Sequence, residues 1–538
     1  MTDFRRSLAA DRSVGAGNFF YRFAEYCAEP DSILLESDVD VVIGDQNLGR
    51  SLSAAVIHLT VEQLVASLLA HGVRPRQPVG VFLADSPLYY LYYIALSRIG
   101  AISVQLNSKM SGSTAAAYLR RVGCRSVVLD AEHVSRLAPH TAALADDSGM
   151  GPRVILNDLL QLDGPSASYE AFAYEASDVV LVAHTSGTTG TPKPVQFTHA
   201  GYFFGVRQQM SHVLGPKVLS ALPHSHGAAM TLFMSTVVRG LPLYAQTQKD
   251  PESLLQTIEA WRPNLVMAFP KPLVDLCRVG LDDRDLSSVS CWMSTGDASH
   301  EPHIRRLVST GSRMVAGRRR KGSLFVDNLG SSEFAFGIFR AVHSPETDSY
   351  ERCIGRPYEW VDVQIFGEDG QPVKTGQVGR LGVKSASVTS GYWNDPVTTQ
   401  AALLHGYWLT GDLIYRAENG LYYHVDRTVD RTLLADRALY SCQLEECLLR
   451  RIPEIFDCTV VGVTHDATRA SGLALAIDLA DRDCDRSALE ARVHELLATL
   501  DIAGPVRIDY VDADWQEGLT GKKLKRLIRD GLTAEAAP

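Results

Sequence analysis

The sequence lacks a basic excess, paired cysteines and long apolar runs, and each absence excludes a class of protein. The 538 residues carry a formal net charge of -10 at pH 7. Nucleic-acid binders usually present a basic surface, so no nucleic-acid partner is expected. The nine cysteines are odd in number and form no CxxC pair, which favours buried thiols in a reducing compartment and leaves no readable zinc site.

Targeting segments are also missing from the places where they would be expected. The first residues, MTDFRRSLAADRSVG, are basic without an apolar core behind them, so neither a signal peptide nor a membrane anchor is predicted. The most apolar early stretch, residues 88–104, is interrupted by Ser97 and Arg98 and falls short of the roughly 20 apolar residues that cross a bilayer. We therefore expect a cytoplasmic protein without a membrane span.

What is present is a regular alternation of helix-period and strand-like segments. At 46% hydrophobic and 21% charged residues, the chain can form a large domain and a smaller one. Repeated alternation predicts a mostly parallel sheet covered on both faces, with ligands at the carboxyl ends of its strands. The expected strands and helices lie at residues 60–110, 199–213, 218–222, 228–238, 252–260, 265–270, 457–465, 473–479 and 487–499.

A loop of small and hydroxyl residues follows the apolar run 179–183. Backbone N–H groups, hydroxyls and one lysine can together hold an anion, so this loop predicts a phosphate site. It is not a Walker loop, because Thr191 and Pro192 separate Gly190 from Lys193. A flexible surface loop is the alternative. The candidate phosphate-binding residues are Thr185, Ser186, Gly187, Thr188, Thr189, Gly190 and Lys193.

Several motifs that follow in order carry a resemblance to a known superfamily. The loop reads HTSGTTGTPKP at 184–194, and later come LGSSE, IGRP, GQVGRLGV, SGYWNDPVTT, GYWLTGDL, VDRTVDR and LTGKKLK. Together they resemble the adenylate-forming superfamily, which includes acyl-CoA synthetases, stand-alone adenylation domains and beetle luciferases. The resemblance covers about residues 50–530 and is strongest to acyl-CoA ligases.

The resemblance implies an α/β fold and a two-step reaction. It implies a large multi-layer αβαβα amino-terminal domain at 1–428 with mostly parallel sheets, a small α+β carboxyl-terminal lid at 429–538, and a hinge at 427–430 that contains Asp430. In the first step a carboxylate would attack the α-phosphate of Mg²⁺-bound ATP and release pyrophosphate. In the second step the thiol of coenzyme A would take the acyl group from the adenylate. A luciferase-like activity has nothing in the sequence to favour it.

The resemblance also assigns roles to individual residues. Catalytic roles fall on Lys522, which would stabilise developing negative charge, and on His226 beside the acyl group. Glu333 would bind Mg²⁺, and Asp412 would accept both ribose hydroxyls. Other nucleotide contacts would come from Gly296, Asp297, Asp327, Asn328, Leu329, Ser332 and Arg427.

Departures from the superfamily pattern keep other functions open. Pro194 and Leu329 replace a glycine and an aromatic residue, and Ala435 and Asp436 stand where coenzyme A ligases usually carry two glycines along the pantetheine passage. The acceptor could therefore be a carrier-protein thiol, or the chain could perform one half-reaction with a partner ligase. A non-catalytic nucleotide-binding homologue is opposed by the presence of Lys522.

Two further features bear on the substrates. The basic run 313–322 is either a solvated loop or an attraction for the 3'-phosphate of coenzyme A. Small and apolar residues around His226 and Leu329 favour a bulky or medium-length apolar acid over acetate.

Overall fold

A computed structural model of the chain describes residues 3–26, 29–145, 151–162, 169–185, 192–212, 214–434, 437–465, 470–511, 518, 523, 525 and 527–529. The chain divides into two compact units. The first unit comprises residues 1–268, 330–337 and 385–401, and the second comprises 269–329, 338–384 and 402–538. The chain therefore passes between the units after residues 268, 329, 337, 384 and 401.

The first unit contains a seven-stranded sheet of order β22-β10-β9-β6-β5-β7-β8. The five strands from β9 to β8 are parallel, and β10 and β22 add antiparallel strands. This confirms the parallel sheet predicted from residues 60–110. Its elements are α3 (Ala54–Ala70), β5 (Pro78–Phe82), α4 (Leu88–Ile99), β6 (Ile102–Gln105), α5 (Gly112–Val122), β7 (Ser126–Leu129), β8 (Arg153–Leu156), β9 (Val179–His184), β10 (Pro194–Thr198) and β22 (Gly391–Tyr392).

A second run of strands in the first unit has the order β13-β11-β12-β1-β4. Strands β13, β11, β12 and β1 are parallel, whereas β4 is antiparallel to β1. The predicted helices and strands between residues 199 and 270 are confirmed. The elements are β1 (Ile33–Ser37), β4 (Ser51–Ser53), α8 (His199–Gln208), β11 (Val218–Ser220), α9 (Gly227–Val237), β12 (Leu243–Ala245), α10 (Pro251–Trp261) and β13 (Leu265–Ala268).

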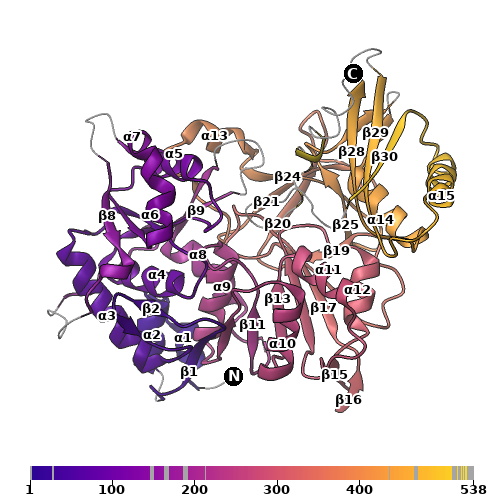
Figure 1. Cartoon of the computed structure of the whole chain (residues 1–538). Helices are drawn as coiled ribbons and strands as arrows, with labels where there is room; N and C mark the ends of the chain where they lie inside the picture. Colours follow the sequence, from indigo (N-terminus) through magenta and orange to yellow (C-terminus); the bar gives the residue numbers. More distant parts are fainter. Residues whose placement is uncertain are drawn as a thin grey trace. The chain divides into compact units, whose positions relative to one another are not determined.

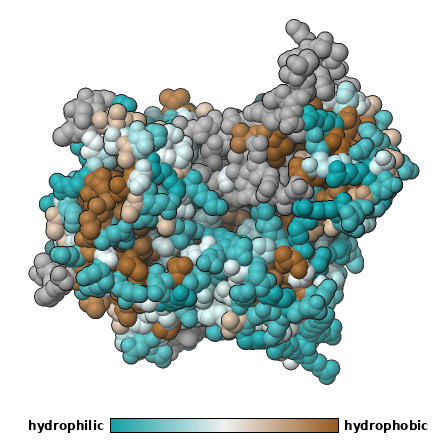
Figure 2. Space-filling view, in the orientation of Figure 1, coloured by the Kyte–Doolittle hydropathy of each residue, from teal (hydrophilic) through white to brown (hydrophobic). Residues whose placement is uncertain are grey.

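Helix α4 explains the most apolar early stretch of the sequence. Every residue of α4 except Arg98 is buried, and the helix ends at Gly100 with φ 84°. A helix that is apolar on all sides belongs in the core of a large unit. On the face shown in Figure 2, hydrophilic residues surround scattered hydrophobic groups. No helix in the described part of the chain is long and apolar enough to cross a membrane.

The remaining elements of the first unit are short. They are α1 (Asp3–Ala10), α2 (Phe19–Tyr26), β2 (Val42–Ile43), β3 (Gln46–Asn47), α6 (Ala131–Leu137), η1 (Ala138–His140), α7 (Thr141–Leu144), η2 (Asn157–Leu159) and α13 (Pro396–Ala401).

The second unit has a sheet run of order β20-β21-β24-β25-β19-β18-β17-β14. Within this run β14 and β17 are parallel to each other, and the other neighbours are antiparallel. The elements are α11 (Pro270–Val279), β14 (Cys291–Thr295), α12 (Glu301–Val308), β17 (Leu324–Leu329), β18 (Phe339–His343), β19 (Cys353–Pro357), β20 (Asp362–Phe366), β21 (Gly379–Lys384), β23 (Leu403–Leu404), β24 (Tyr407–Arg416) and β25 (Tyr422–Arg427).

The carboxyl-terminal part of the second unit is a small α+β layer, as predicted. Strands β28, β29 and β30 form one sheet, and Figure 1 shows α14 and α15 next to it. Buried side chains such as Leu448, Val460, Leu475 and Val493 fill the space between helices and sheet. The elements are β26 (Thr432–Leu434), β27 (Arg437–Leu439), α14 (Ser441–Arg451), β28 (Ile455–His465), β29 (Ala470–Leu479), α15 (Arg486–Thr499) and β30 (Val506–Tyr510).

Candidate nucleotide site

Asp412 lies in the middle of an antiparallel pair in the second unit. In the register of β24 and β25, Asp412 is opposite Arg427, so the two predicted nucleotide residues are brought together. Gly411 before it has φ 83°, a conformation that favours glycine. The backbone N–H of Asp412 donates to Thr410 Oγ1 over 3.0 Å. The local turn therefore fixes the direction in which the carboxylate points.

The Asp412 carboxylate is buried, yet it remains charged. Its Oδ1 lies 3.2 Å from Arg427 Nε and 3.4 Å from His424 Nε2. Burial alone would raise the pKa of Asp412, but the charge of Arg427 and the contact with His424 lower it to about 2. A hydrogen bond with the Thr410 side chain lowers the pKa as well. A deprotonated carboxylate is suited to accepting hydrogen bonds from hydroxyl groups.

The carboxyl ends of β14 and β17 bring together a second set of predicted residues. Parallel pairing places Ser294 opposite Asp327 and Thr295 opposite Asn328. Gly296 follows β14 with φ 91°, and exposed Asp297 comes next. Strand ends of this kind are where ligands collect in parallel sheets.

Asn328 and Asp327 differ in how they are held. Asn328 Oδ1 accepts from the Tyr358 hydroxyl over 3.2 Å, and its carbonyl oxygen accepts from Thr295 Oγ1 over 3.2 Å. Burial raises the pKa of Asp327 to about 7, although the charge of Arg352 opposes that rise. Near neutral pH this carboxyl group can therefore either donate or accept a hydrogen bond.

Glu333 lies in residues 330–337, the short segment of the first unit that follows β17. Its Oε1 accepts from the Tyr392 hydroxyl over 2.8 Å, and its Oε2 accepts from Ser331 Oγ over 2.7 Å. Its carbonyl oxygen accepts from Thr389 N over 2.8 Å. Ser332, the predicted phosphate contact, is the adjacent residue and is half-buried. The segment is thus tied to residues 389–392 of the same unit.

The ends of the predicted phosphate loop are described, whereas its centre is not. Residues 186–191 lie outside the described part of the chain. Thr185 and Lys193 flank them: Thr185 N donates to Lys193 O over 3.2 Å, and Lys193 N donates to Thr185 Oγ1 over 3.0 Å. The Lys193 ammonium lies 5.2 Å from the centre of the Tyr392 ring. The loop therefore joins two antiparallel strands, β9 and β10, and Pro194 is the first residue of β10.

His226 begins helix α9 and is less buried than a second histidine in the same loop. His226 Nδ1 accepts from Ala228 N over 3.1 Å, which caps the helix. His224 is fully buried, and its Nδ1 lies 3.0 Å from the Tyr90 hydroxyl. Burial lowers the pKa of His224 to about 4. The structure therefore gives His226 a capping contact and does not test its predicted catalytic role.

Two lysines that follow Lys522 within three positions form ion pairs with buried carboxylates. Lys522 itself lies outside the described residues. Lys523 Nζ is 2.7 Å from Asp457 Oδ1, and Lys525 Nζ is 2.8 Å from Glu445 Oε1. These contacts give Lys523 and Lys525 structural partners within the carboxyl-terminal layer.

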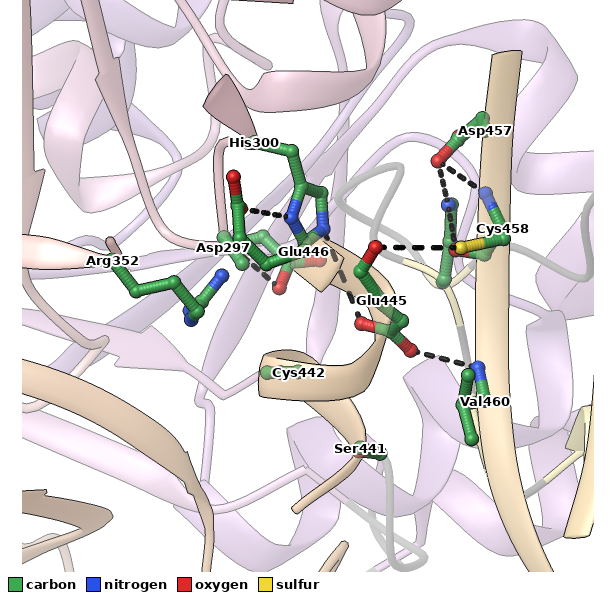
Figure 3. A network of polar contacts seen from close by, with 12 residues as sticks. Asp297, His300, Arg352, Ser441, Cys442, Glu445, Glu446, Asp457, Cys458 and Val460 are labelled. Carbon is green, nitrogen blue, oxygen red and sulfur yellow. Dashed lines mark hydrogen bonds and ion pairs between the residues drawn. The ribbon is translucent and has the colours of Figure 1, made fainter. Parts of the chain in front are cut away.

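Figure 3 shows the polar cluster around Glu445 and Glu446, in which His300 lies between the two glutamates. His300 Nδ1 is 2.8 Å from Glu446 Oε2, and Glu301 N donates to Glu446 Oε1 over 3.0 Å. Val460 N donates to Glu445 Oε1 over 2.8 Å. The cluster thus links α12, α14 and β28 within the second unit.

Three further predicted features have different outcomes. Asp430, the predicted hinge residue, is half-buried, and burial raises its pKa. Ala435 and Asp436 lie outside the described residues. The basic run 313–322 forms the two-stranded hairpin of β15 (Ser312–Val315) and β16 (Arg318–Lys321), and every residue of β16 is exposed. Its predicted contact with coenzyme A remains a prediction.

Three side chains at the site were not predicted from the sequence: two contact predicted site residues, and the third contacts one of those two. Tyr392 lies beside Glu333, His424 lies beside Asp412, and Arg352 contacts His424. Tyr392 is inside the SGYWNDPVTT motif and His424 precedes VDRTVDR by one residue, so proximity to a motif was the available signal. Arg352 precedes the IGRP motif by two residues, so the same signal was available for it.

Comparison with known proteins decides the family. The family model for "AMP-binding enzyme" matches residues 33–393. The chain belongs to this family. The likeness to solved structures confirms the fold: an anthranilate CoA ligase, AuaEII, in complex with anthranoyl-AMP matches with a TM-score of 0.83 at 19% identity, covering 100% of both chains.

Relatives of this AMP-binding enzyme have more than one activity. It is 35% identical to a 3-aminoavenalumate diazotase of Streptomyces sp over 557 residues, which covers 99% of this chain and 98% of that protein. It is 25% identical to a 3-hydroxybenzoate–CoA ligase of Aromatoleum sp. (strain CIB), covering 93% of this chain and 94% of that protein. The family includes many CoA ligases, but membership alone does not select the acceptor.

Proposed function

We propose that this enzyme adenylates an oxyanion at the α-phosphate of ATP and releases pyrophosphate. The observation that carries the proposal is the charged, buried Asp412 carboxylate, whose Oδ1 contacts Arg427 and His424. An acceptor-only group of this kind is suited to the two ribose hydroxyls. Asn328, Gly296 and half-buried Asp327 would contact the adenine.

The metal requirement fits Glu333. Among the described residues no group of three or more His, Cys, Asp or Glu side chains could hold a metal ion by itself. Mg²⁺ is commonly held by one or two carboxylates together with substrate phosphates, and Glu333 offers one carboxylate next to the Ser332 hydroxyl. When bound, Mg²⁺ would neutralise charge that develops on the phosphate oxygens.

The remaining roles rest on the resemblance and are proposed with it. Thr185, Lys193 and residues 186–190 would hold the phosphates. Lys522 would stabilise negative charge on the attacking oxyanion and the α-phosphate. Residues 429–538 would act as a lid that turns about a hinge at 427–430, which includes Asp430, as hinged domains do in other enzymes.

For the acceptor we propose an aromatic amine, with nitrite as the activated oxyanion. The support is the 35% identity to a diazotase over nearly the full length of both chains, together with Ala435 and Asp436 in place of two glycines along the expected coenzyme A passage. The diazotase name also specifies an amino group and a carboxylate on one substrate. An aromatic amino acid that carries both groups is therefore the proposed substrate class.

The proposed chemistry balances with the reactants named. A nitrite oxygen attacks the α-phosphorus of ATP, the bond to the β-phosphate oxygen breaks, and pyrophosphate leaves. The amine nitrogen of the substrate then attacks the nitroso nitrogen, AMP leaves and one proton is lost. The N-nitrosamine tautomerises to a diazohydroxide, takes up one proton and loses its oxygen as water, which gives the aryl diazonium ion. No oxidant or reductant is needed, because nitrite supplies nitrogen at the required oxidation level.

A second candidate is an acid–thiol ligase that makes an acyl adenylate and transfers the acyl group to coenzyme A. The full-length relationship to a 3-hydroxybenzoate–CoA ligase favours this function. Its substrate would be a bulky or medium-length apolar acid that lies near His226 and Leu329. A carrier-protein thiol, or a partner ligase that completes one half-reaction, are variants of the same candidate.

Pyrophosphate release from Mg²⁺ and ATP tests these proposals in one assay. The acids would be 3-aminobenzoate, anthranilate and 3-aminocinnamate, each paired with its amine-free counterpart, with and without nitrite and with and without coenzyme A. ¹⁵N-nitrite would label the diazonium product. This product is trapped as an azo dye, and the mass of the dye is measured by mass spectrometry. Omitting ATP controls for spontaneous diazotisation.

The outcomes separate the two candidates. Nitrite-dependent pyrophosphate release, with a labelled azo product formed from the amino-substituted acids but not from their amine-free counterparts, would support the diazotase proposal. Release that depends on an acid and coenzyme A, without nitrite, would support the ligase instead. If no combination released pyrophosphate, the proposed adenylation would be wrong.

A further inference from the structure

Arg352 and His424 form a contact that reaches Asp412 from behind. Arg352 is next to the first residue of β19, and His424 lies in β25. Arg352 Nη2 donates to His424 Nδ1 over 2.8 Å, and His424 N donates to Arg352 O over 3.0 Å. The second ring nitrogen, His424 Nε2, lies 3.4 Å from Asp412 Oδ1. The imidazole therefore bridges a guanidinium and a carboxylate.

The guanidinium determines which nitrogen of His424 carries the proton. Arginine offers only donors, so Nδ1 must accept and the proton must be on Nε2. That proton points at Asp412. Burial and the charge of Arg352 lower the pKa of His424, although the contact with Asp412 opposes this. His424 is therefore a neutral imidazole whose Nε2 proton points at Asp412. Its ring is buried, with 7% exposure, so it has little freedom to turn.

Arg352 lies in a strained part of the backbone and has buried donors. Arg352 has φ 58° and the preceding Glu351 has φ 41°, so two adjacent side-chain-bearing residues are left-handed. Arg352 Nε and Nη1 are buried and have no hydrogen-bond partner among the described residues. Such backbone strain and unpaired donors each cost stability, and strain of this kind clusters at functional sites.

The surroundings of Arg352 are acidic and would not by themselves select His424 as its partner. Figure 3 shows the Arg352 side chain reaching toward the cluster that contains Glu446 and Asp297, yet no hydrogen bond joins it to either residue. Its hydrogen bond goes instead to a neutral imidazole. This hydrogen bond orients the His424 ring so that its second nitrogen faces Asp412.

We propose that Arg352 and His424 are positioning residues that lock the Asp412 carboxylate for a ribose with both hydroxyls. His424 and Arg427 both hold Oδ1, so they restrict rotation of the carboxylate and keep it in one orientation for the sugar. A locked acceptor loses binding energy when a hydroxyl is missing, whereas a rotating one can adapt. The inference rests on the proposed role of Asp412 in nucleotide binding and adds discrimination between ATP and deoxynucleotides.

Matched substitutions of His424 test the bridge. His424→Phe keeps a flat ring but removes both polar contacts. His424→Gln keeps an acceptor for Arg352 and a donor for Asp412, so it should rescue the function. Arg352→Met keeps the length of the side chain and removes its donors. Thermal unfolding and circular dichroism would show that each variant folds.

The deciding measurement is the ratio of dissociation constants for ATP, 2'-deoxyATP and 3'-deoxyATP, obtained by calorimetry with Mg²⁺ and without any other substrate. His424→Phe should reduce the preference for ATP about tenfold. Arg352→Met should reduce it by roughly threefold to tenfold, and His424→Gln should stay within about twofold of the wild-type enzyme. The double variant should lose no more than His424→Phe, because the two residues act through one contact.

A spectroscopic readout separates positioning from general damage. In enzyme labelled with ¹⁵N-histidine, the ring nitrogens of His424 should report a proton on Nε2, and Arg352→Met should introduce the Nδ1-protonated form. Unchanged nucleotide ratios in both His424→Phe and Arg352→Met would overturn the proposal, even if all nucleotides bound more weakly. A wild-type enzyme that bound ATP without discrimination would overturn it as well.

Failure of the proposed function gives a different result. If the wild-type enzyme bound no ATP at all, the adenylation proposal would be wrong together with this one. If it bound and discriminated among nucleotides but made no diazonium or thioester product, only the choice of acceptor would be wrong.

Discussion

Glu333 in the first unit and Asp412 in the second are held in opposite ways. Glu333 accepts hydrogen bonds from two neutral hydroxyls, those of Tyr392 and Ser331. Asp412 contacts the charged guanidinium of Arg427 and the imidazole of His424. Neutral donors orient a carboxylate without cancelling its charge, whereas a guanidinium cancels much of it.

The difference indicates which ligand each carboxylate can take. A carboxylate that keeps its charge attracts a metal cation, which fits Glu333. A carboxylate whose charge is already matched has little attraction for a cation but still accepts hydrogen bonds from hydroxyls, which fits Asp412. Asp327 is a third case, because burial outweighs the charge of Arg352 and raises its pKa to about 7.

The largest expected effect comes from Asp412→Asn. The substitution keeps the shape of the side chain but removes its negative charge. One of the two acceptor oxygens is replaced by an NH₂ group, which cannot accept a hydrogen bond from Arg427 or from a ribose hydroxyl. We expect ATP to bind about 100-fold more weakly, since hydrogen bonds to charged groups contribute about 1.5–3 kcal/mol each. Calorimetric titration with ATP measures this. Asp362→Asn is the control, because Asp362 is exposed and its Oδ2 accepts a hydrogen bond from the Tyr407 hydroxyl over 2.8 Å. Equal losses in both variants would contradict the assignment.

Asp327→Asn should change how stability depends on pH. The folded protein holds the Asp327 proton more tightly than the unfolded chain, so this contribution is full below pH 3.8 and is lost as the pH rises through about 7. Asparagine does not titrate, so the variant does not lose this contribution. The difference in unfolding free energy between the variant and the wild-type enzyme should therefore shift in favour of the variant by on the order of 2 kcal/mol from pH 5 to pH 8.

Urea unfolding at pH 5 and pH 8 measures this gain, again with Asp362→Asn as the control. A parallel pH dependence in the wild-type enzyme and Asp327→Asn would show that Asp327 titrates normally.

Glu333→Gln should raise the Mg²⁺ concentration needed for half-maximal pyrophosphate release about tenfold, because the amide keeps one acceptor but loses the charge that attracts the cation. The dissociation constant for ATP without Mg²⁺ should change little. A Mg²⁺ requirement equal to that of the wild-type enzyme would remove the contrast between Glu333 and Asp412.

Tyr392→Phe should have the smallest effect, because it removes a neutral donor and leaves the Glu333 charge in place. We expect the Mg²⁺ requirement to rise about fivefold or less, in line with the loss of one hydrogen bond of about 1 kcal/mol. The same titration measures it. If Tyr392→Phe matched Glu333→Gln, the hydroxyl rather than the charge would be what matters.

The sequence could predict the parts of the site that depend on local order. The pairing of Asp412 with Arg427 follows from two strands joined by a short turn, and the pairing of Thr295 with Asn328 follows from parallel strands that end at one edge. The alternation of helices and strands between residues 60 and 270 was likewise readable, because apolar periodicity decides it.

The contacts that escaped prediction depend on the register between distant strands. Arg352 and His424 are 72 positions apart, and they meet because β19 pairs with β25 through an irregular register between Cys353 and Gly355. Lys525 is a similar case, since only the packing of α14 brings Glu445 to it. No motif or period in the sequence records an irregular register or a helix packing angle.

The five passages of the chain between the two units constrain how this enzyme can be divided. A fragment that ended at Ala268 would keep Thr185 and Lys193 but would lose Glu333 and Tyr392, which the first unit receives from later segments. A single proteolytic cut therefore releases neither unit intact, and a gene fusion at one junction cannot transplant either of them. Recombination between relatives can exchange whole units only by replacing several separate stretches of the gene together.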